Sequence, residues 1–388
     1  MSNIVLSAAV RQNLLSLQST ADLLATTQNR LSTGKKVNTA LDNPTNYFTA
    51  QGLDNRANDI SNLLDGIGNG VQVLQAANTG LTSLQKLVDT AKSIANQVLQ
   101  APAGYSPKST VTSAVALTGN SANLVDGTII KAGDVLTIAS TGGGTATSIT
   151  FGASESLDQL NVALAANNLS ASLDSANKLV ITTTNDAASS TIGVVAYPGA
   201  GTGTLTFGAV AAPVADAASQ IIRANLVSQY NNVITQITTT AQDSSFNGIN
   251  LLNGDDLKLT FNETGKSTLI IKGVTFNAAG LGLAPLVAGT DFLDSASAKA
   301  TMAKITSASD ALRTQASTLG SNLSIVQIRQ DFSKNLINVL QTGSANLTLA
   351  DTNEEAANSQ ALATRQSIAV SALALANQAQ ASVLQLLR

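Results

Sequence analysis

The chain has 388 residues, of which 44% are hydrophobic, 3% aromatic and 12% charged, and its formal net charge is −3. It contains no His, Cys or Trp, so the commonest general base, the thiol nucleophile and the two strongest ligands for transition metals are missing. The slight negative charge offers no basic patch for a phosphate backbone. These counts predict a protein that is not an enzyme, holds no metal or cofactor, and binds no nucleic acid.

The first predicted helix carries apolar side chains at alternating steps of four and three, the spacing of a coiled-coil seam. Ala21 and Gln28 complete the seam, and Gly34 is expected to end the helix. Between residues 1 and 29 the charged residues are Arg11 and Asp22, which leaves few positions suited to a solvated face. We therefore expect other copies of the chain to cover the seam residues Val10, Leu14, Leu17, Leu24 and Leu31.

The C-terminal region repeats this pattern. Apolar residues spaced by seven run from Ile305 to Val326, and the last segment has its own seam at Ile368, Ala372, Leu375, Ala379 and Leu386. An isolated helix with such a seam is marginal in water. The two ends of the chain are therefore expected to pair with each other and, through the faces still exposed, with other copies.

The middle of the chain differs in composition, being rich in Gly, Ser and Thr from residue 101 to 214. Short runs of β-forming residues at 134–139, 148–151 and 178–183, with a short helix within 155–168, predict a β-β-α-β unit. After residue 215 a helical period returns, and runs at 257–261 and 267–271 predict a β-hairpin.

The predicted fold is mainly α with β insertions: a long antiparallel coiled-coil or helical bundle from the two ends, a β-hairpin in the bundle layer, and one inserted β-rich outer domain. The expected division places terminal helices at 1–42 and 345–388, a helical bundle at 43–100 and 215–344, and the insertion at 101–214. No signal peptide or membrane-spanning run is visible in the sequence, so no membrane insertion is expected.

Three motifs in this chain resemble those of the bacterial flagellins. The run from Arg30 through Gly34 to Asn38 is similar to the end of the family's first helix, and Asp42-Asn-Pro stands where members carry Asp-Asp-Ala or a variant. Phe246-Asn247-Gly248 resembles a motif that precedes the family's hairpin. The ending at Arg388, with Ala-Asn-Gln followed by Val-Leu-Gln-Leu-Leu-Arg, is similar to the family's C-terminus.

This resemblance implies a subunit that leaves the cell through the flagellar export apparatus and polymerises into the extracellular flagellar filament. It also implies the flagellar cap, hook-junction proteins and an export chaperone as partners, besides many copies of the chain itself. The alternatives are a hook–filament junction protein and, with less support, a surface adhesin on a coiled-coil stalk. Arg30 has two open interpretations: a cation at a helix C-terminus, or a contact to a neighbouring subunit.

Overall fold

The computed structural model describes residues 8–198 and 203–386, with side chains described up to Ser382 except that of Gln380. The elements divide into two units. The first contains α1 (Ala8–Thr33), the start of α2 (Pro44–Gln100) up to Asn69, the hairpin segment Lys258–Leu269, the part of α5 (Ser295–Thr348) from Ile325 on, and α6 (Thr352–Leu386). The second contains the remaining described residues. Each unit is described separately below.

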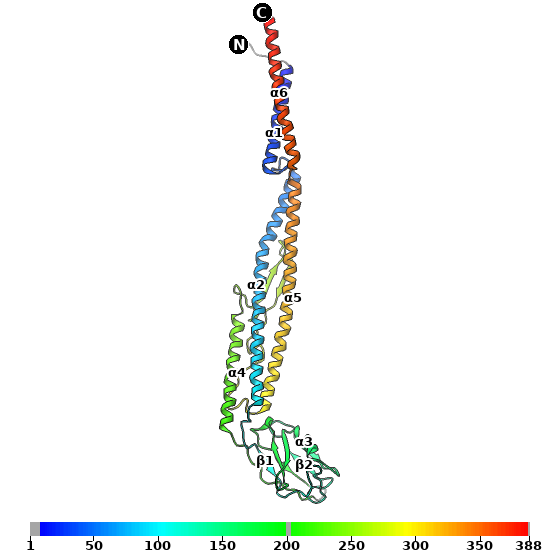
Figure 1. The fold of residues 1–388 in the computed structure, drawn as a ribbon, viewed down its shortest axis with the longest axis vertical. Coiled ribbons are helices and arrows are strands. Elements are labelled where there is room, and N and C mark those ends of the chain that lie inside the picture. Colours follow the sequence, from blue (N-terminus) through cyan, green and yellow to red (C-terminus); the bar gives the residue numbers. More distant parts are fainter. Residues whose placement is uncertain (1–7, 199–202, 387–388) are drawn as a thin grey trace. The chain divides into compact units, whose positions relative to one another are not determined.

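In the first unit, α1 and α6 pack side by side and antiparallel (Figure 1). The facing parts of α2 and α5 also run antiparallel and share a small aliphatic core of Ala57, Ile60, Ile337 and Leu340. A Cβ at Gly343 would lie 3.4 Å from the Leu53 side chain, so this position of α5 lies against α2.

β7 (Leu257–Thr260) and β8 (Thr268–Ile271) form a hairpin, and its segment Lys258–Leu269 contacts α2 and α5 within the first unit. Arg56 of α2 donates to Glu263 at 2.9 Å. Arg329 of α5 donates to Ser267 at 3.0 Å, and its guanidinium lies 5.2 Å from the centre of the Phe261 ring. Contacts of the hairpin with both helices fix its position, as the predicted hairpin in the bundle layer requires.

In the second unit, α4 (Ala217–Asp243) joins the remaining parts of α2 and α5. Gln85 of α2 donates to Ser309 of α5 at 2.7 Å. The buried side of α4 consists of residues that recur at helical spacing, including Leu226, Tyr230, Ile234 and Ile237.

The inserted domain of the second unit has two three-stranded antiparallel sheets. One is ordered β1 (Thr110–Thr112), β5 (Leu179–Thr183), β4 (Leu169–Leu173), and the other β3 (Thr147–Thr150), β2 (Val135–Ile138), β6 (Val195–Ala196). The helix α3 (Leu157–Ala165) begins at a capping box between Ser156 and Gln159, and a short 3-10 turn, η1 (Asn185–Ala187), follows β5. The sheets and α3 enclose an apolar core that includes Leu136, Leu160, Leu179 and Ile181.

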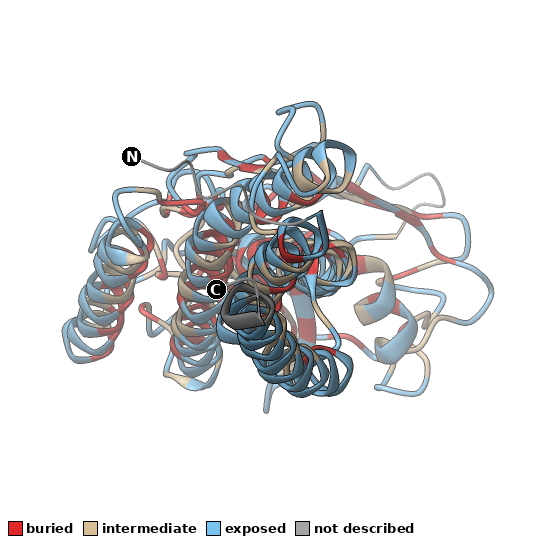
Figure 2. Cartoon of the chain, turned by 90° about the horizontal axis from the view of Figure 1, so that it is seen from above, coloured by how far each residue is buried: buried red, intermediate tan, exposed pale blue. Residues whose placement is uncertain are grey.

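The predicted fold class, mainly α with β insertions, is confirmed. The predicted strands correspond to β2, β3 and β5 and the predicted helix to α3, whereas β1, β4 and β6 were not predicted. The inserted domain is therefore larger than a β-β-α-β unit. Figure 2 shows the helices striped, with pale blue exposed residues beside red buried ones.

Candidate assembly surfaces of the terminal helices

The side of α1 that packs against α6 differs in part from the predicted seam. Its buried and half-buried side chains recur at steps of three and four: Val10, Asn13, Leu17, Thr20, Leu24 and Thr27. Leu14 and Leu31 of the predicted seam are exposed. Thr20 can lie in this contact because its hydroxyl donates to the Ser16 carbonyl at 2.8 Å, which satisfies the buried polar group.

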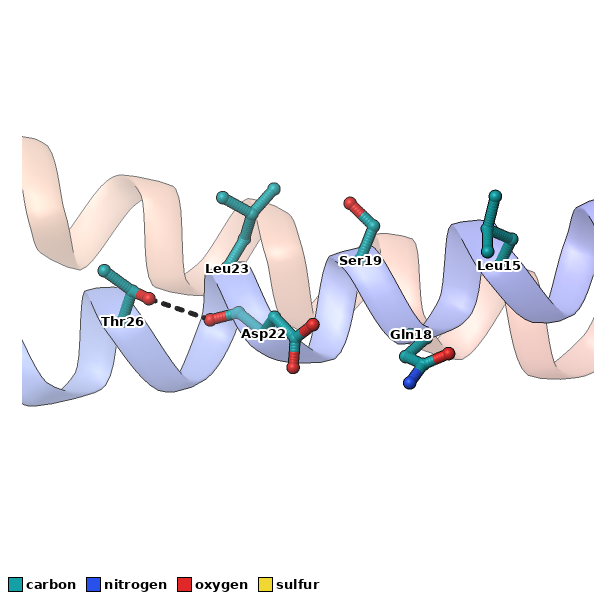
Figure 3. A pocket seen from close by; sticks show the side chains of 6 residues that line it. All are labelled: Leu15, Gln18, Ser19, Asp22, Leu23 and Thr26. Carbon is teal, nitrogen blue, oxygen red and sulfur yellow. Dashed lines mark hydrogen bonds between the residues drawn. The ribbon is translucent and has the colours of Figure 1, made fainter.

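A second apolar side of α1 faces away from α6. Leu15 and Leu23 are exposed and, with Ser19 between them, line a shallow groove on the outer surface of the helix. Figure 3 shows these three side chains projecting from the same side of α1. Leu15 and Leu23 lie outside the predicted seam, although their separation by eight residues, or two steps of four, places them on one ridge.

The α6 helix also has two sides. Its half-buried residues, which recur at steps of three and four, are Ser359, Leu362, Gln366, Ala369, Leu373 and Ala376. The predicted seam lies on the opposite side: Ile368 is 63% exposed, Leu375 is 70% exposed, and Ala372 and Ala379 are also exposed. The side chain of Leu386 and the whole of Arg388 lie outside the described residues. Both terminal helices therefore carry one apolar side used within the chain and one left open to solvent.

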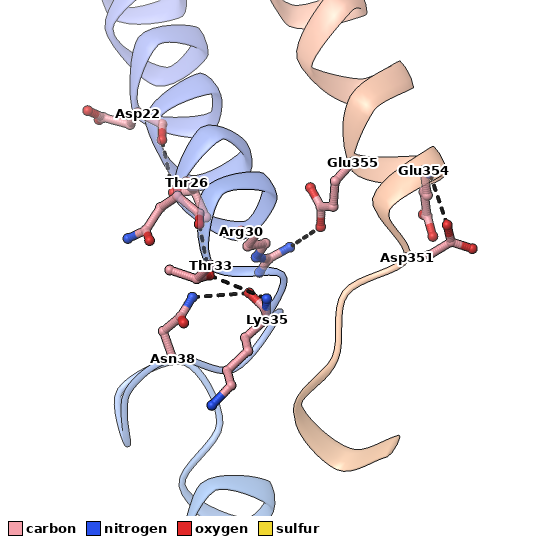
Figure 4. Close-up of polar contacts among 10 residues, drawn as sticks. Asp22, Thr26, Arg30, Thr33, Lys35, Asn38, Asp351, Glu354 and Glu355 are labelled. Atoms are coloured by element: carbon pink, nitrogen blue, oxygen red, sulfur yellow. Dashed lines mark hydrogen bonds and ion pairs between the residues drawn. The ribbon is translucent and has the colours of Figure 1, made fainter. Parts of the chain in front are cut away.

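An ion pair links the end of α1 to the start of α6. The Arg30 guanidinium donates to a Glu355 carboxylate oxygen at 3.2 Å, with the two side chains 37% and 10% exposed (Figure 4). Glu355 lies in the first turn of α6, where a carboxylate also suits the helix dipole. Arg30 thus has a role that neither sequence interpretation named, because its partner is 325 residues away in the chain.

The segments that follow α1 and precede α6 pair through their backbones. Gly34 adopts φ +69°, a left-handed conformation that ends α1 after Thr33 as predicted. The Lys36 amide donates to the Thr348 carbonyl at 2.7 Å, and the Ala350 amide donates to the Gly34 carbonyl at 3.0 Å. The segment between α1 and α2 and the segment between α5 and α6 are therefore joined to each other by backbone hydrogen bonds.

Asn38 and Asp42 form the turn between α1 and α2. One Asp42 carboxylate oxygen accepts the Thr39 and Asn38 amides at 2.8 and 2.9 Å, and these bonds lower the pKa of the Asp42 carboxyl below its ordinary value. The Asn43 side chain then accepts the Asn46 amide, and Pro44 occupies the first position of α2. The first helix therefore stops and the second starts within this short turn.

Phe246, Asn247 and Gly248 form a tight turn after α4. Phe246 and Ile249 exchange two backbone hydrogen bonds of 3.0 Å, and Asn247 and Gly248 both have positive φ, +50° and +80°. This is the conformation of a type I′ turn, which Asn-Gly favours. Nearby, the buried Asn250 side chain donates to the Ala241 and Gln242 carbonyls at 2.8 Å and caps α4. The motif therefore forms the turn between α4 and the hairpin, and its role is structural.

Among residues 8–198 and 203–386, no group of three or more carboxylates is placed to hold a metal ion. No helix in the part of the chain that the structure describes has the length and apolarity needed to cross a membrane.

Terminal helices that pair across a long stretch of sequence, each with an apolar side left exposed, are typical of structural subunits that associate with other copies. Residues 3–128 match the model of the bacterial flagellin N-terminal helical region, and residues 302–387 match that of the bacterial flagellin C-terminal helical region. The chain belongs to the bacterial flagellin family, a family of structural proteins, and the resemblance described above is confirmed.

Relatives in two bacteria are similar over part of the chain. Flagellins FljM and FljK of Caulobacter vibrioides are 33% and 32% identical over 165 residues, which cover 42% of this chain and 59% of each relative. Flagellin C of Rhizobium meliloti is 30% identical over 139 residues, covering 35% of this chain and 41% of that protein. The matched part of the chain thus spans about three fifths, or less, of the relatives' own lengths.

Proposed function

We propose that this chain is a structural subunit that polymerises into the bacterial flagellar filament and transmits motor torque for swimming. The observation that carries the proposal is the pair of apolar sides on α1 and α6 that stay exposed among the described residues, represented by Leu15 and Leu375. Exposure of such apolar sides to water is unfavourable, and association with other copies would bury them. Membership in the flagellin family supports a helical homopolymer as the assembly.

In this proposal α1 and α6 form the inner tube of the filament, and residues 43–100 and 215–344 form the layer around it. Residues 101–214 lie on the outer surface, where their apolar core needs no partner because it is closed within the chain. The residues assigned to copy-to-copy contacts are those exposed on the terminal helices: Leu14, Leu15, Leu23, Ile368, Ala372 and Leu375.

The proposal includes export through the flagellar export apparatus and contacts with the flagellar cap, the hook-junction proteins and an export chaperone. It includes no catalysis, and the Arg30–Glu355 ion pair is assigned a structural role in joining the two terminal helices. Nothing observed favours the hook–filament junction protein or the surface adhesin.

The test is seeded polymerisation of the purified chain, followed by electron microscopy. We expect long tubes of uniform diameter to grow from short filament seeds. Chains lacking residues 1–30 or 360–388 are expected to stay monomeric while retaining the inserted domain. Persistent monomers of the full chain at high concentration and salt, or polymers from either truncated chain, would refute the assigned role of the terminal helices.

A further inference from the structure

A cleft of 460 Å³ opens in the second unit, where the inserted domain meets the start of α5. Lys108, Thr184 and Asp186 line it from the inserted domain, and Ser295 and Lys299 line it from α5. Its volume is far above the roughly 30 Å³ that one water occupies and is in the range of small-molecule pockets. The cleft therefore has room for a small organic molecule.

The charges that line this cleft do not balance. The Lys108 ammonium donates to the Asn185 side-chain oxygen at 3.2 Å, and the Lys299 ammonium pairs with the Asp186 carboxylate at 2.7 Å. An ammonium group has three N–H donors, so each lysine keeps donors for a further partner. Asp186 offsets only one of the two lysines that line the cleft. The remaining positive charge favours a ligand with a negatively charged group.

Ser295, the first residue of α5, points to a ligand independently of the lysines. It is only 7% exposed and lines the cleft. Its hydroxyl has no hydrogen-bond partner among the described residues, whereas the nearby Ser297 hydroxyl accepts the Phe292 amide at 3.1 Å. A buried hydroxyl without a partner is unfavourable until a bound molecule satisfies it. The partial positive charge at the start of the helix favours an anion at the same place.

Two carboxylates limit the charge of that anion. Asp186 lines the cleft, and Asp294 directly precedes α5. The Asp294 carboxylate accepts the Ser189 amide at 2.8 Å and also the Ser189 hydroxyl, and it interacts electrostatically with the buried Arg223. It is therefore engaged outside the cleft, but a doubly charged phosphate would still meet repulsion from both acids. A single carboxylate matches the one positive charge left by the lysines.

The rest of the cleft suits hydroxyl groups on the ligand. The Thr184 hydroxyl makes no capping hydrogen bond, and Ser170 and Asn185 add further polar groups to the lining. Leu99 of α2 supplies an apolar side against which a short carbon chain can pack. We propose that the cleft binds a small polyhydroxylated monocarboxylic acid, whose carboxylate lies at Lys108, Lys299 and the start of α5. Such a ligand contacts the inserted domain and α5 together.

NMR titration of the monomeric full chain with D-gluconate at low salt tests the site. The amides of Lys108, Ser295 and Lys299 are expected to shift with a Kd of about 1 mM. Sorbitol, which has the hydroxyls without the carboxylate, should leave these amides unchanged, and acetate, which has no hydroxyls, should bind at least about fivefold more weakly. Unchanged amides with gluconate, or acetate, sorbitol or inorganic phosphate binding as tightly as gluconate, would overturn the proposal.

Substitutions on α5 test the residues assigned to the carboxylate. Lys299→Gln is expected to weaken gluconate binding at least about tenfold, and Lys304→Gln, at an exposed position of α5 that does not line the cleft, by less than about twofold. Ser295→Ala should weaken it about threefold, with the exposed Ser307→Ala as its control. Equal binding by Lys299→Gln and Lys304→Gln would contradict the site.

Asp186→Asn separates a binding site from a purely structural joint. It breaks the same ion pair as Lys299→Gln, but it removes a negative charge from the cleft instead of a positive one. Gluconate should therefore bind about threefold more tightly to Asp186→Asn. Weakening by both substitutions would show that the pair only holds the inserted domain in place, and would overturn the proposal. These measurements use the monomer, so failure of the chain to polymerise would contradict the proposed function without affecting this test.

Discussion

Arg30 and Glu355 lie 325 residues apart in the chain and meet with a nitrogen–oxygen distance of 3.2 Å, at the point where α1 ends and α6 begins. Their contact joins the two helices beside the buried and half-buried side chains through which α1 and α6 pack. Because Glu355 is nearly buried, loss of Arg30 leaves its carboxylate without an ion-pair partner.

Arg30→Gln is therefore expected to loosen the terminal pair by about 1 kcal/mol. Hydrogen exchange of the α1 amides measures this as faster exchange. The double variant Arg30→Gln, Glu355→Gln should recover part of the loss, since it removes the unpaired charge. Equal exchange rates in Arg30→Gln and the unsubstituted chain would show that the pair does not hold the helices.

The turn before α2 is expected to depend on pH through Asp42. The Thr39 and Asn38 amides lower the pKa of its carboxyl below the ordinary value of 3.8, so the stabilisation is present above about pH 4 and is lost as the pH falls through the lowered pKa. Carboxyl titration by NMR should give a midpoint below 3.8, and Asp42→Asn should leave the Asn38 and Thr39 amides less protected at neutral pH. A midpoint at or above 3.8 would contradict the hydrogen-bonded turn.

Arg223 of α4 is buried and donates to the carbonyls of Ala101, Pro102 and Phe292. It thereby ties the chain after α2 to the chain before α5. Lys cannot reproduce this planar set of donors, so Arg223→Lys is expected to lower the free energy of unfolding by about 3 kcal/mol. Urea denaturation measures the change, and Arg313→Lys, at an exposed arginine of α5, serves as the control with a change within about 0.5 kcal/mol.

Gly248 occupies a left-handed position in the turn after α4, with φ +80°. Gly248→Ala is expected to destabilise the chain by about 1 to 2 kcal/mol because of the strain at positive φ. Gly320→Ala, in the open middle of α5, should instead stabilise it by about 0.5 to 1 kcal/mol. Thermal unfolding of both variants tests the turn, and a stabilising Gly248→Ala would contradict it.

Residues that end helices or favour strands predicted the secondary structure at their own positions. Gly34 marked the end of the first helix, and clustered β-forming residues marked β2, β3 and β5. By contrast, β4 has alternating small residues, Leu169-Ser-Ala-Ser-Leu, and becomes a strand by pairing with β5. Strands of this kind depend on a partner that local pattern does not reveal.

Local sequence pattern also failed to identify which side of each terminal helix packs within the chain. Hydropathy selected the stripe through Ile368 and Leu375 because its side chains are large. The stripe that packs against α1 contains Gln366 and Ala369, whose polarity and small size conceal a packed face. The division into terminal helices, bundle and insertion remains a prediction.

The most direct test of the proposed assembly follows one thiol through polymerisation. Leu375→Cys places a unique cysteine at a position that is 70% exposed in the chain, and Val162→Cys on α3, where Val162 is 78% exposed, is its control. Both thiols are expected to react rapidly with a maleimide in the monomer. In the polymer, Leu375→Cys should be protected and Val162→Cys should still react. Equal labelling of Leu375→Cys before and after polymerisation would contradict burial of the outer side of α6 between subunits.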